Sequence, residues 1–290
     1  MKRFKKIYIE ITNRCDLSCT FCPRSSRPAQ TMTPAFFQSV LEKIKPYTDY
    51  LYFHVMGEPL MHPDLETLLD VSFEHGFKVN LTTNGTLIKR TGPNIIQKQA
   101  LRQINFSLHS CLVNESKGAG VGEYLTDVID FAKTAFREKG PIICLRLWNA
   151  TEIGDVSANG DILERIGREF DCARALTDPV KLFEGVKIAD RIFLNCAVEF
   201  DWPSLDKKDN GREGFCLGLR DQLAVLVDGT VVPCCLDARG EIALGNIGLQ
   251  SIEEIMHSPR ARAVYEGFSK RMVVEELCRR CGFRLRFGLF

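Results

Sequence analysis

The stretch CDLSCTFCPR, residues 15–24, decides how the rest of the sequence is interpreted. It gathers Cys15, Cys19 and Cys22 in the spacing C-x-x-x-C-x-x-C, directly behind an alternating segment that predicts a β-strand over 6–11. Structural zinc sites usually close with four ligands, often as two C-x-x-C pairs. Three thiolates on one short loop suit a 4Fe–4S cluster better, because its fourth iron stays open to a small ligand. A zinc ion completed by a distant His or Cys is the alternative.

Length and composition restrict the class of protein. The chain has 290 residues, 45% of them hydrophobic, which is enough for one large domain and one small one. The net charge of +1 favours neither nucleic acid nor an anionic membrane as partner. We expect no signal peptide, because the basic N-terminus runs straight into a strand pattern, and no membrane span, because no apolar run approaches the length that one needs. Twelve cysteines in such a chain indicate metal or redox use, so we expect a cytoplasmic protein with reduced thiols.

Strand and helix patterns alternate about six times after the first strand. Further strands are predicted at 50–55, 77–83, 104–110, 141–148 and 191–200, and helices at 34–44, 64–76, 86–100, 122–139 and 160–170. Such alternation predicts a parallel sheet with helices outside it. Six units are too few for an eight-stranded barrel, so we expect an α/β fold, a partial (β/α)6 TIM-like barrel over 1–200. Its functional groups are expected at the carboxyl ends of the strands, converging on one mouth.

The pattern changes beyond a polar segment, 201–215, which we interpret as a linker to a small C-terminal domain over 216–290. Asp228-Gly229 predicts a two-residue hairpin turn, which would place Cys234 opposite Leu223 and near Cys216. Neighbouring strand residues point to opposite faces, so Cys234 and Cys235 should not serve one site together. This hairpin-plus-helix domain then has four metal ligands and one spare cysteine among Cys216, Cys234, Cys235, Cys278 and Cys281. Four thiolates suit zinc and iron–sulfur equally well.

The cysteine loop resembles that of the radical S-adenosylmethionine (radical SAM) superfamily, with Phe21 as the aromatic residue before the last cysteine. The second strand is followed by Gly57-Glu58-Pro59, similar to the superfamily's glycine–glutamate–proline motif, although Met56 replaces its first glycine. The resemblance implies that Cys15, Cys19 and Cys22 hold a 4Fe–4S cluster whose open iron chelates SAM. Reductive cleavage of SAM would then produce a 5′-deoxyadenosyl radical that abstracts hydrogen from the substrate.

The same resemblance, together with strand-end positions, gives a set of candidate SAM contacts. Asn84-Gly85 is also a plain turn signal, and Ser107 also suits a structural hydrogen bond, so each candidate has a structural alternative. The candidates are Phe21, Gly57, Glu58, Pro59, Thr83, Asn84, Ser107, His109 and Arg146. Candidate catalytic or substrate-side residues are Cys111, as hydrogen-atom donor or inert thiol, and the strand-end residues Trp148 and Glu199.

The C-terminal cysteines resemble the SPASM domain that follows many radical SAM barrels. Cys216, Gly229 and Cys234 match the spacing at its start, and the chain has no cysteine after Cys281, as in the shortened "twitch" form. This implies one auxiliary 4Fe–4S cluster for electron transfer and makes Cys235 a bystander. Its expected ligands are Cys216, Cys234, Cys278 and Cys281. Nearby arginines either raise its potential or form a solvated basic tail: Arg279, Arg280, Arg284 and Arg286.

The layout is most similar to the aminocyclitol dehydrogenases of this superfamily, which implies a radical SAM oxidoreductase of a small alcohol. The alternative within the superfamily is maturation of a ribosomal peptide by crosslinking or epimerisation. The absence of a domain before the first strand favours a small substrate. The alternative outside it is a non-catalytic iron–sulfur electron carrier or a zinc-binding module. For the enzyme we expect a flavodoxin- or ferredoxin-type electron donor and no nucleic-acid or membrane partner.

Overall fold

The computed structural model of the chain describes residues 4–23, 27–112 and 121–287. The chain divides into two compact units, which are described separately below. The first unit contains residues 1–15, 20–79 and 200–290, and the second contains residues 16–19 and 80–199. The cysteine loop therefore has residues in both. The first three residues of the basic N-terminus and the last three of the chain lie outside the described residues.

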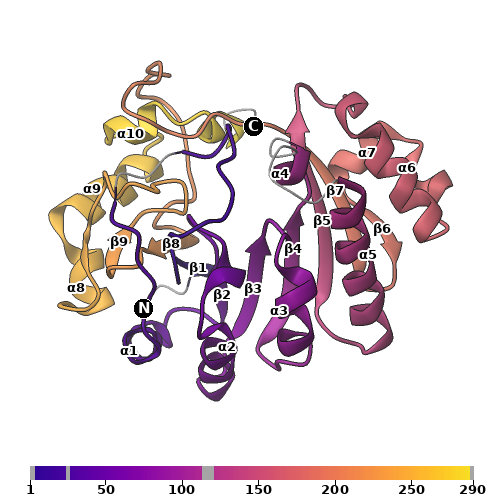
Figure 1. Ribbon diagram of the computed structural model, residues 1–290. Coiled ribbons are helices and arrows are strands. Elements are labelled where there is room, and N and C mark those ends of the chain that lie inside the picture. The colour runs from indigo at the N-terminus through magenta and orange to yellow at the C-terminus, as the bar shows by residue number, and fades with distance from the viewer. Residues whose placement is uncertain (1–3, 24–26, 113–120, 288–290) are drawn as a thin grey trace. The chain divides into compact units, whose positions relative to one another are not determined.

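The first unit is built around strand β1 (Lys6–Ile9). On one side β1 pairs in parallel with β2 (Tyr50–Phe53), and on the other with β8 (Gln222–Val225). Antiparallel β9 (Thr230–Val232) and β10 (Gly245–Asn246) continue the sheet beyond β8. Figure 1 shows the orange β8 and β9 beside the indigo β1. The C-terminal segment thus extends the same sheet that the N-terminal strand begins.

Helices cover this sheet with apolar faces. In α1 (Pro34–Ile44), Thr33 caps the first turn by accepting from the Phe36 N–H, and Phe37 is fully buried. Helix α2 (Leu65–Glu74) packs beside α1. The remaining helical elements of this unit are the 3₁₀ turn η1 (Pro59–Met61), α8 (Ile252–His257), α9 (Pro259–Ser269), α10 (Glu276–Arg279) and the 3₁₀ turn η5 (Phe283–Phe287).

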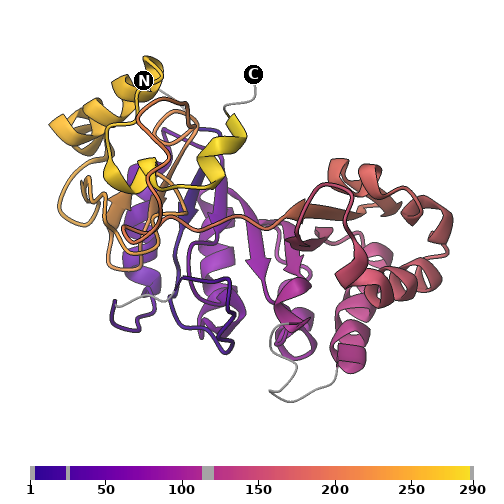
Figure 2. The same cartoon turned by 90° about the horizontal axis from the view of Figure 1, so that it is seen from above.

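The second unit has three parallel strands, β4 (Leu101–Ser107), β5 (Ile142–Ala150) and β7 (Ile192–Val198), with β6 (Val186–Ala189) antiparallel to β7. Strand β3 (Lys78–Thr83) leads into it. Helix α3 (Ile88–Ile95) lies beside α5 (Val121–Arg137), and α5 beside α6 (Gly160–Glu169) (Figures 1 and 2). Two shorter helices are α4 (His109–Leu112) and α7 (Pro179–Glu184). No helix among the described residues is long and apolar enough to cross a bilayer.

The expected α/β class is confirmed, and the six predicted strands appear as β1 to β5 and β7. The segment between α6 and β7 was not predicted, because its elements are too short to show periodicity. It holds the 3₁₀ turn η4 (Ala173–Leu176), α7 and β6; a further 3₁₀ turn, η3 (Ser157–Asn159), precedes α6. The division into barrel, linker and C-terminal domain stays a prediction.

The hairpin register corrects two expectations. Ala224 pairs with Val232, and the N–H of Leu226 donates to the carbonyl of Thr230, so three residues form the loop rather than two. Gly229 supplies the left-handed conformation (φ +88°) that such a three-residue loop needs. Cys234 is therefore not opposite Leu223. Strand β9 also ends before the two cysteines, so strand alternation is the wrong reason for separating them.

Candidate functional site

The Gly57-Glu58-Pro59 turn packs directly against the backbone before Cys15. Gly57 has φ +79°, and a Cβ on it would lie 2.8 Å from the carbonyl oxygen of Arg14 and 2.9 Å from the carbonyl carbon of Asn13. Only glycine fits that approach without displacing backbone. The N–H of Glu58 then donates to the Arg14 carbonyl over 2.7 Å. The turn that follows β2 thus holds the start of the cysteine loop in place.

Glu58 itself is a buried acidic side chain, 1% exposed. Its carboxylate accepts the N–H of Leu60 over 2.9 Å and so caps η1, which Pro59 begins. Pro59 has no N–H to leave unpaired at this first position and fixes the backbone angle. The carboxylate is therefore held in one orientation by local structure, as a ligand-binding carboxylate requires.

A buried ion pair anchors the other end of the cysteine loop. Arg27 donates two hydrogen bonds to Glu10, of 2.8 and 2.6 Å, and a third of 3.1 Å to the carbonyl of Ala238. Glu10 is 1% exposed and also accepts the N–H of Val227 over 3.0 Å. The segment after Cys22 is thereby attached to both β1 and the β8–β9 hairpin. Sequence reasoning missed this pair, because nothing local links the two residues.

The three loop cysteines are not buried in the core. Cys15 is exposed, whereas Cys19 and Cys22 are half-buried, as is Phe21. Within the second unit, Asp16 accepts from the side chains of Asn84, over 2.8 Å, and Thr86, over 2.5 Å. The expected turn at Asn84-Gly85 is present, and it also ties residue 16 of the loop to the end of β3.

The two predicted residues of this turn are buried. Thr83, 2% exposed, accepts the N–H of Gly85 through its hydroxyl over 2.9 Å. The backbone carbonyl of Asn84 accepts the hydroxyl of Tyr124 from α5 over 2.7 Å. Both residues therefore help to fix the shape of the strand end, and their role as SAM contacts stays a prediction.

Strand ends in the second unit bring several candidates together. Ser107 of β4 and Arg146 of β5 are direct register partners. The Arg146 guanidinium lies 4.6 Å from the centre of the Trp148 ring, and the Trp148 indole N–H donates to the side chain of Asn195 over 2.8 Å. These residues share one face of β5, because the alternate residues Leu145 and Leu147 are fully buried on the other. Asn195 was not predicted, since it lies inside an otherwise apolar strand pattern.

The other second-unit candidates differ in burial. His109 begins α4 rather than ending β4, and its Nδ1 lies 3.3 Å from the carbonyl oxygen of Arg146. Burial lowers the pKa of His109 to about 4, so its ring is neutral at pH 7. Cys111 is half-buried in the same helix, and its N–H donates to the Leu108 carbonyl. Glu199 is exposed just after β7, where its N–H donates to the Ala150 carbonyl over 2.9 Å.

Four C-terminal cysteines of the first unit lie near one another. Burial, and then the negative charges of neighbouring thiolates, raise the pKa of Cys234 well above its usual value. Those neighbours are Cys235, which contributes most, and the other three predicted ligands, Cys216, Cys278 and Cys281. Burial followed by the charges of Cys216 and Cys281 raises the pKa of Cys278 in the same way. Mutual repulsion of this kind disappears when a metal cluster binds the thiolates, so the grouping fits an iron–sulfur site.

The fifth cysteine, Cys235, has a different partner. The Tyr8 hydroxyl of β1 donates a hydrogen bond to its sulfur. Burial raises the pKa of Cys235 to about 11, so this thiol stays protonated at pH 7. Cys235 is packed with Tyr8, Ala224 and Leu226 in a buried cluster. Its environment is that of the packed bystander expected from the sequence.

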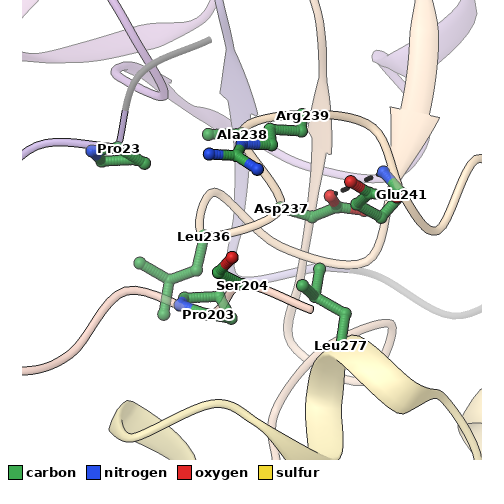
Figure 3. Close-up of a pocket in the computed structure, with 9 residues that line it drawn as sticks. All are labelled: Pro23, Pro203, Ser204, Leu236, Asp237, Ala238, Arg239, Glu241 and Leu277. Atoms are coloured by element: carbon green, nitrogen blue, oxygen red, sulfur yellow. Dashed lines mark hydrogen bonds between the residues drawn. The ribbon is translucent and has the colours of Figure 1, made fainter. Parts of the chain in front are cut away.

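The loop after Cys235 is fixed by a buried carboxylate. Asp237, 2% exposed, accepts the N–H groups of Glu241 over 2.9 Å and Ile242 over 2.8 Å. Figure 3 shows Asp237 turned toward Glu241 beside a small pocket of about 10 Å³. The pocket also touches Pro23, which follows Cys22, and Leu277, which precedes Cys278. This pocket of the first unit is therefore lined by residues that neighbour both cysteine groups.

The donor groups limit which metals could be held here. Within residues 4–23, 27–112 and 121–287, no three His, Cys, Asp or Glu side chains are arranged closely enough to bind a single metal ion. The ligands of a 4Fe–4S cluster bind four different irons and stand farther apart than the ligands of one ion. Thiolates are the ligands that such clusters use, and the two cysteine groups supply three and four of them.

Comparison with known proteins matches two families to this chain. Residues 9–146 match the radical SAM superfamily, and residues 216–282 match SPASM, an iron–sulfur cluster-binding domain. An S-adenosylmethionine-dependent nucleotide dehydratase from Selenomonas ruminantium is 26% identical over 188 residues, 61% of this chain and slightly under two thirds (66%) of that protein. An S-adenosyl-L-methionine-dependent 2-deoxy-scyllo-inosamine dehydrogenase from Niallia circulans is 22% identical over 97% of this chain and 93% of its own length.

A solved structure shares the fold over almost the whole chain. It is Streptococcus suis SuiB bound to precursor peptide SuiA, with a TM-score of 0.63 and 17% identity, covering 97% of this chain and 70% of that one. The two family matches imply SAM, a SAM-binding 4Fe–4S cluster and iron–sulfur binding in the C-terminal segment. The cofactors expected from the sequence are thereby confirmed, whereas the role of each individual residue stays a prediction.

Proposed function

Because the chain belongs to the radical SAM superfamily and carries a SPASM-type iron–sulfur domain, we propose that it is a radical SAM oxidoreductase of a small alcohol or aminocyclitol-type substrate. The main support is that Cys216, Cys234, Cys278 and Cys281 all lie in the segment that matches an iron–sulfur cluster-binding domain, since one auxiliary cluster is enough to accept one electron per turnover. Similarity to the Niallia circulans dehydrogenase along 97% of the chain supports the same reaction type.

We propose that Cys15, Cys19 and Cys22 hold the SAM-binding cluster, and that Glu58 receives the amino group of SAM. When bound, the cluster and SAM supply the 5′-deoxyadenosyl radical that removes hydrogen from the substrate. The contribution of the protein is to hold the cysteine loop and the Glu58 carboxylate in position. Gly57 permits the close approach that fixes the start of the cysteine loop, and the hydrogen bond from Leu60 orients the Glu58 carboxylate.

The remaining SAM contacts are proposed for strand-end residues, as the resemblance to the superfamily implies. Arg146 is suited to the methionine carboxylate, because a guanidinium forms paired hydrogen bonds with carboxylates and Ser107 lies beside it in register. Its contact with the Trp148 ring restricts where the guanidinium points. We assign Trp148 and Glu199 to the substrate side. Cys111 as hydrogen-atom donor belongs to the epimerisation alternative, because dehydrogenation oxidises the substrate radical and returns no hydrogen atom to it.

The decisive experiment measures metal content and SAM cleavage. Protein reconstituted without oxygen should hold about two 4Fe–4S clusters, one for each group of cysteines. With a reductant and SAM it should release 5′-deoxyadenosine. Cys19→Ala should abolish that product, whereas Cys234→Ala should retain cleavage but stop substrate oxidation. Cys172→Ala is the matched control, since this half-buried thiol belongs to neither cysteine group and donates to the nearby Ile166 carbonyl. Zinc in place of iron would support the binding-module alternative and refute the enzyme.

Peptide maturation is the second candidate, supported by the shared fold with the peptide-bound SuiB structure. It predicts that a precursor peptide, but no small alcohol, increases 5′-deoxyadenosine release. For either substrate we propose a flavodoxin- or ferredoxin-type electron donor and a cytoplasmic location, because the open iron and free thiols need a reducing compartment. Exchange of the chemical reductant for a reduced flavodoxin tests the donor directly.

A further inference from the structure

Arg284 is a buried cation in the 3₁₀ turn η5, and its side chain reaches the backbone of a predicted cluster ligand in helix α10. It is 4% exposed and donates from Nε to the Cys278 carbonyl over 3.0 Å. Its other donors reach the carbonyls of Glu213, over 2.7 Å, and of Asn210 and Gly211, over 3.3 and 3.2 Å. All of these acceptors are neutral. A buried charge normally requires an opposite charge nearby, because transfer from water to a protein interior is costly.

The neighbouring arginines show the contrast. Arg279 lies 3.3 Å from the carboxylate of Asp209, and Arg280 lies 2.8 Å from that of Glu276. Arg286 stacks against aromatic rings, 5.0 Å from the centre of Phe283. In the part of the chain that the structure describes, no carboxylate lies within ion-pair distance of Arg284. Its protein environment thus supplies hydrogen bonds but no negative charge.

The backbone makes room for this guanidinium. Gly214 has φ +143°, and a Cβ placed on it would collide with Nη1 of Arg284. Any residue other than glycine would fill the space that the guanidinium occupies. The guanidinium that fills this space donates to the backbone carbonyl of Cys278, so the cation lies beside one of the predicted ligands.

We propose that Arg284 is the buried counter-ion of the auxiliary cluster and raises its reduction potential. This inference rests on the proposed cluster at Cys216, Cys234, Cys278 and Cys281. Four thiolates give that cluster a net negative charge, and one added electron increases it, so a fixed buried cation favours the reduced state. In the proposed dehydrogenation the substrate loses a hydrogen atom to the radical, a proton to a base and one electron to this cluster, which leaves a carbonyl. Arg284 affects the electron transfer, and it does so through the cluster, without touching the substrate.

The test is a redox titration of the auxiliary cluster, followed by electron paramagnetic resonance. The full chain is used with Cys15, Cys19 and Cys22 replaced by Ala, so that the signal reports one cluster. Arg284→Gln should lower the midpoint: at a fixed potential its ratio of reduced to oxidised cluster should fall about tenfold, which is 59 mV for one electron. Arg284→Lys keeps the charge and should stay close to the parent. Arg262→Gln, at an exposed position of α9, is the matched control and should leave the midpoint unchanged.

Each outcome decides one question. An unchanged midpoint in Arg284→Gln overturns the counter-ion role. An equal fall in Arg284→Gln and Arg284→Lys also overturns it, because the hydrogen bonds of the guanidinium, and not its charge, would then set the midpoint. If Arg284→Gln loses its iron while Arg284→Lys retains four iron atoms, the requirement for charge is supported. Loss of iron in both variants overturns it. A parent protein that binds zinc or no metal refutes the proposed function instead.

Discussion

Gly57→Ala is expected to release the cysteine loop from the turn that follows β2. A left-handed backbone conformation costs a non-glycine residue about 1–2 kcal/mol. At φ +79° the new Cβ would also lie 2.8 Å from the Arg14 carbonyl oxygen and still closer to that of Thr12, both of them backbone atoms. Overpacking of this kind costs about 1–3 kcal/mol. The sum, roughly 2–5 kcal/mol, is a large fraction of the stability of a typical domain.

The matched control is Gly211→Ala. Gly211 has a similar φ of +85°, but a Cβ there would meet no atom within 4 Å. It should therefore show only the conformational cost of about 1–2 kcal/mol. Urea unfolding of the metal-free variants gives the two free energies, and iron analysis after reconstitution reports the clusters. Gly57→Ala should keep the auxiliary iron and lose that of the cysteine loop. Equal stability of the two variants, with full iron in both, would refute the clash.

Three further changes test other contacts. Arg27→Met leaves the Glu10 carboxylate buried without its partner, so the free energy of unfolding should fall by about 3–5 kcal/mol near pH 7. The loss should be smaller near pH 5, where Glu10 can be neutral. Adding Glu10→Gln to the Arg27→Met chain should restore part of the lost stability. The pKa of His109 is about 4 in the folded chain and about 6.5 in the unfolded chain, so between these pH values the unfolded chain binds the proton more readily. Acidification from pH 6.5 to 4 should therefore remove up to about 3 kcal/mol of the free energy of unfolding. His109→Gln should remove that part of the pH dependence in urea titrations, and an unchanged slope would contradict the burial of the ring. Cys235→Ala should retain the auxiliary iron, unlike Cys234→Ala, while the unpaired Tyr8 hydroxyl costs about 1–3 kcal/mol in the same unfolding assay.

The regular elements could be predicted because their patterns are local. The period-2 alternation of β1 and the Thr33-Pro34 helix start each lie within a few residues, and both elements form where expected. The hairpin register could not be predicted, because Asp228-Gly229 is compatible with loops of two or three residues. The choice depends on the hydrogen bond that closes the loop at Leu226, which only the folded backbone shows.

The candidate site was predictable where one short motif contains the chemistry. The three loop cysteines and the Gly57-Glu58-Pro59 turn belong to this class. The contacts that hold the motifs are not local: Arg27 reaches Ala238, and Trp148 reaches Asn195. Similarly, the C-terminal arginines look alike in the sequence. Only burial and hydrogen-bond partners distinguish Arg284, because these depend on which carbonyl groups the fold brings around each side chain.

The pairing of β8 with β1 has a consequence for biogenesis. Lys6 is translated long before its strand partner Gln222, because the two residues lie far apart in the sequence. Contacts between such distant residues form slowly, and until then one edge of β1 presents unpaired backbone groups to its surroundings. The sheet of the first unit is therefore complete only after β8 has been synthesised, and an open strand edge of this kind is a site at which aggregation can begin.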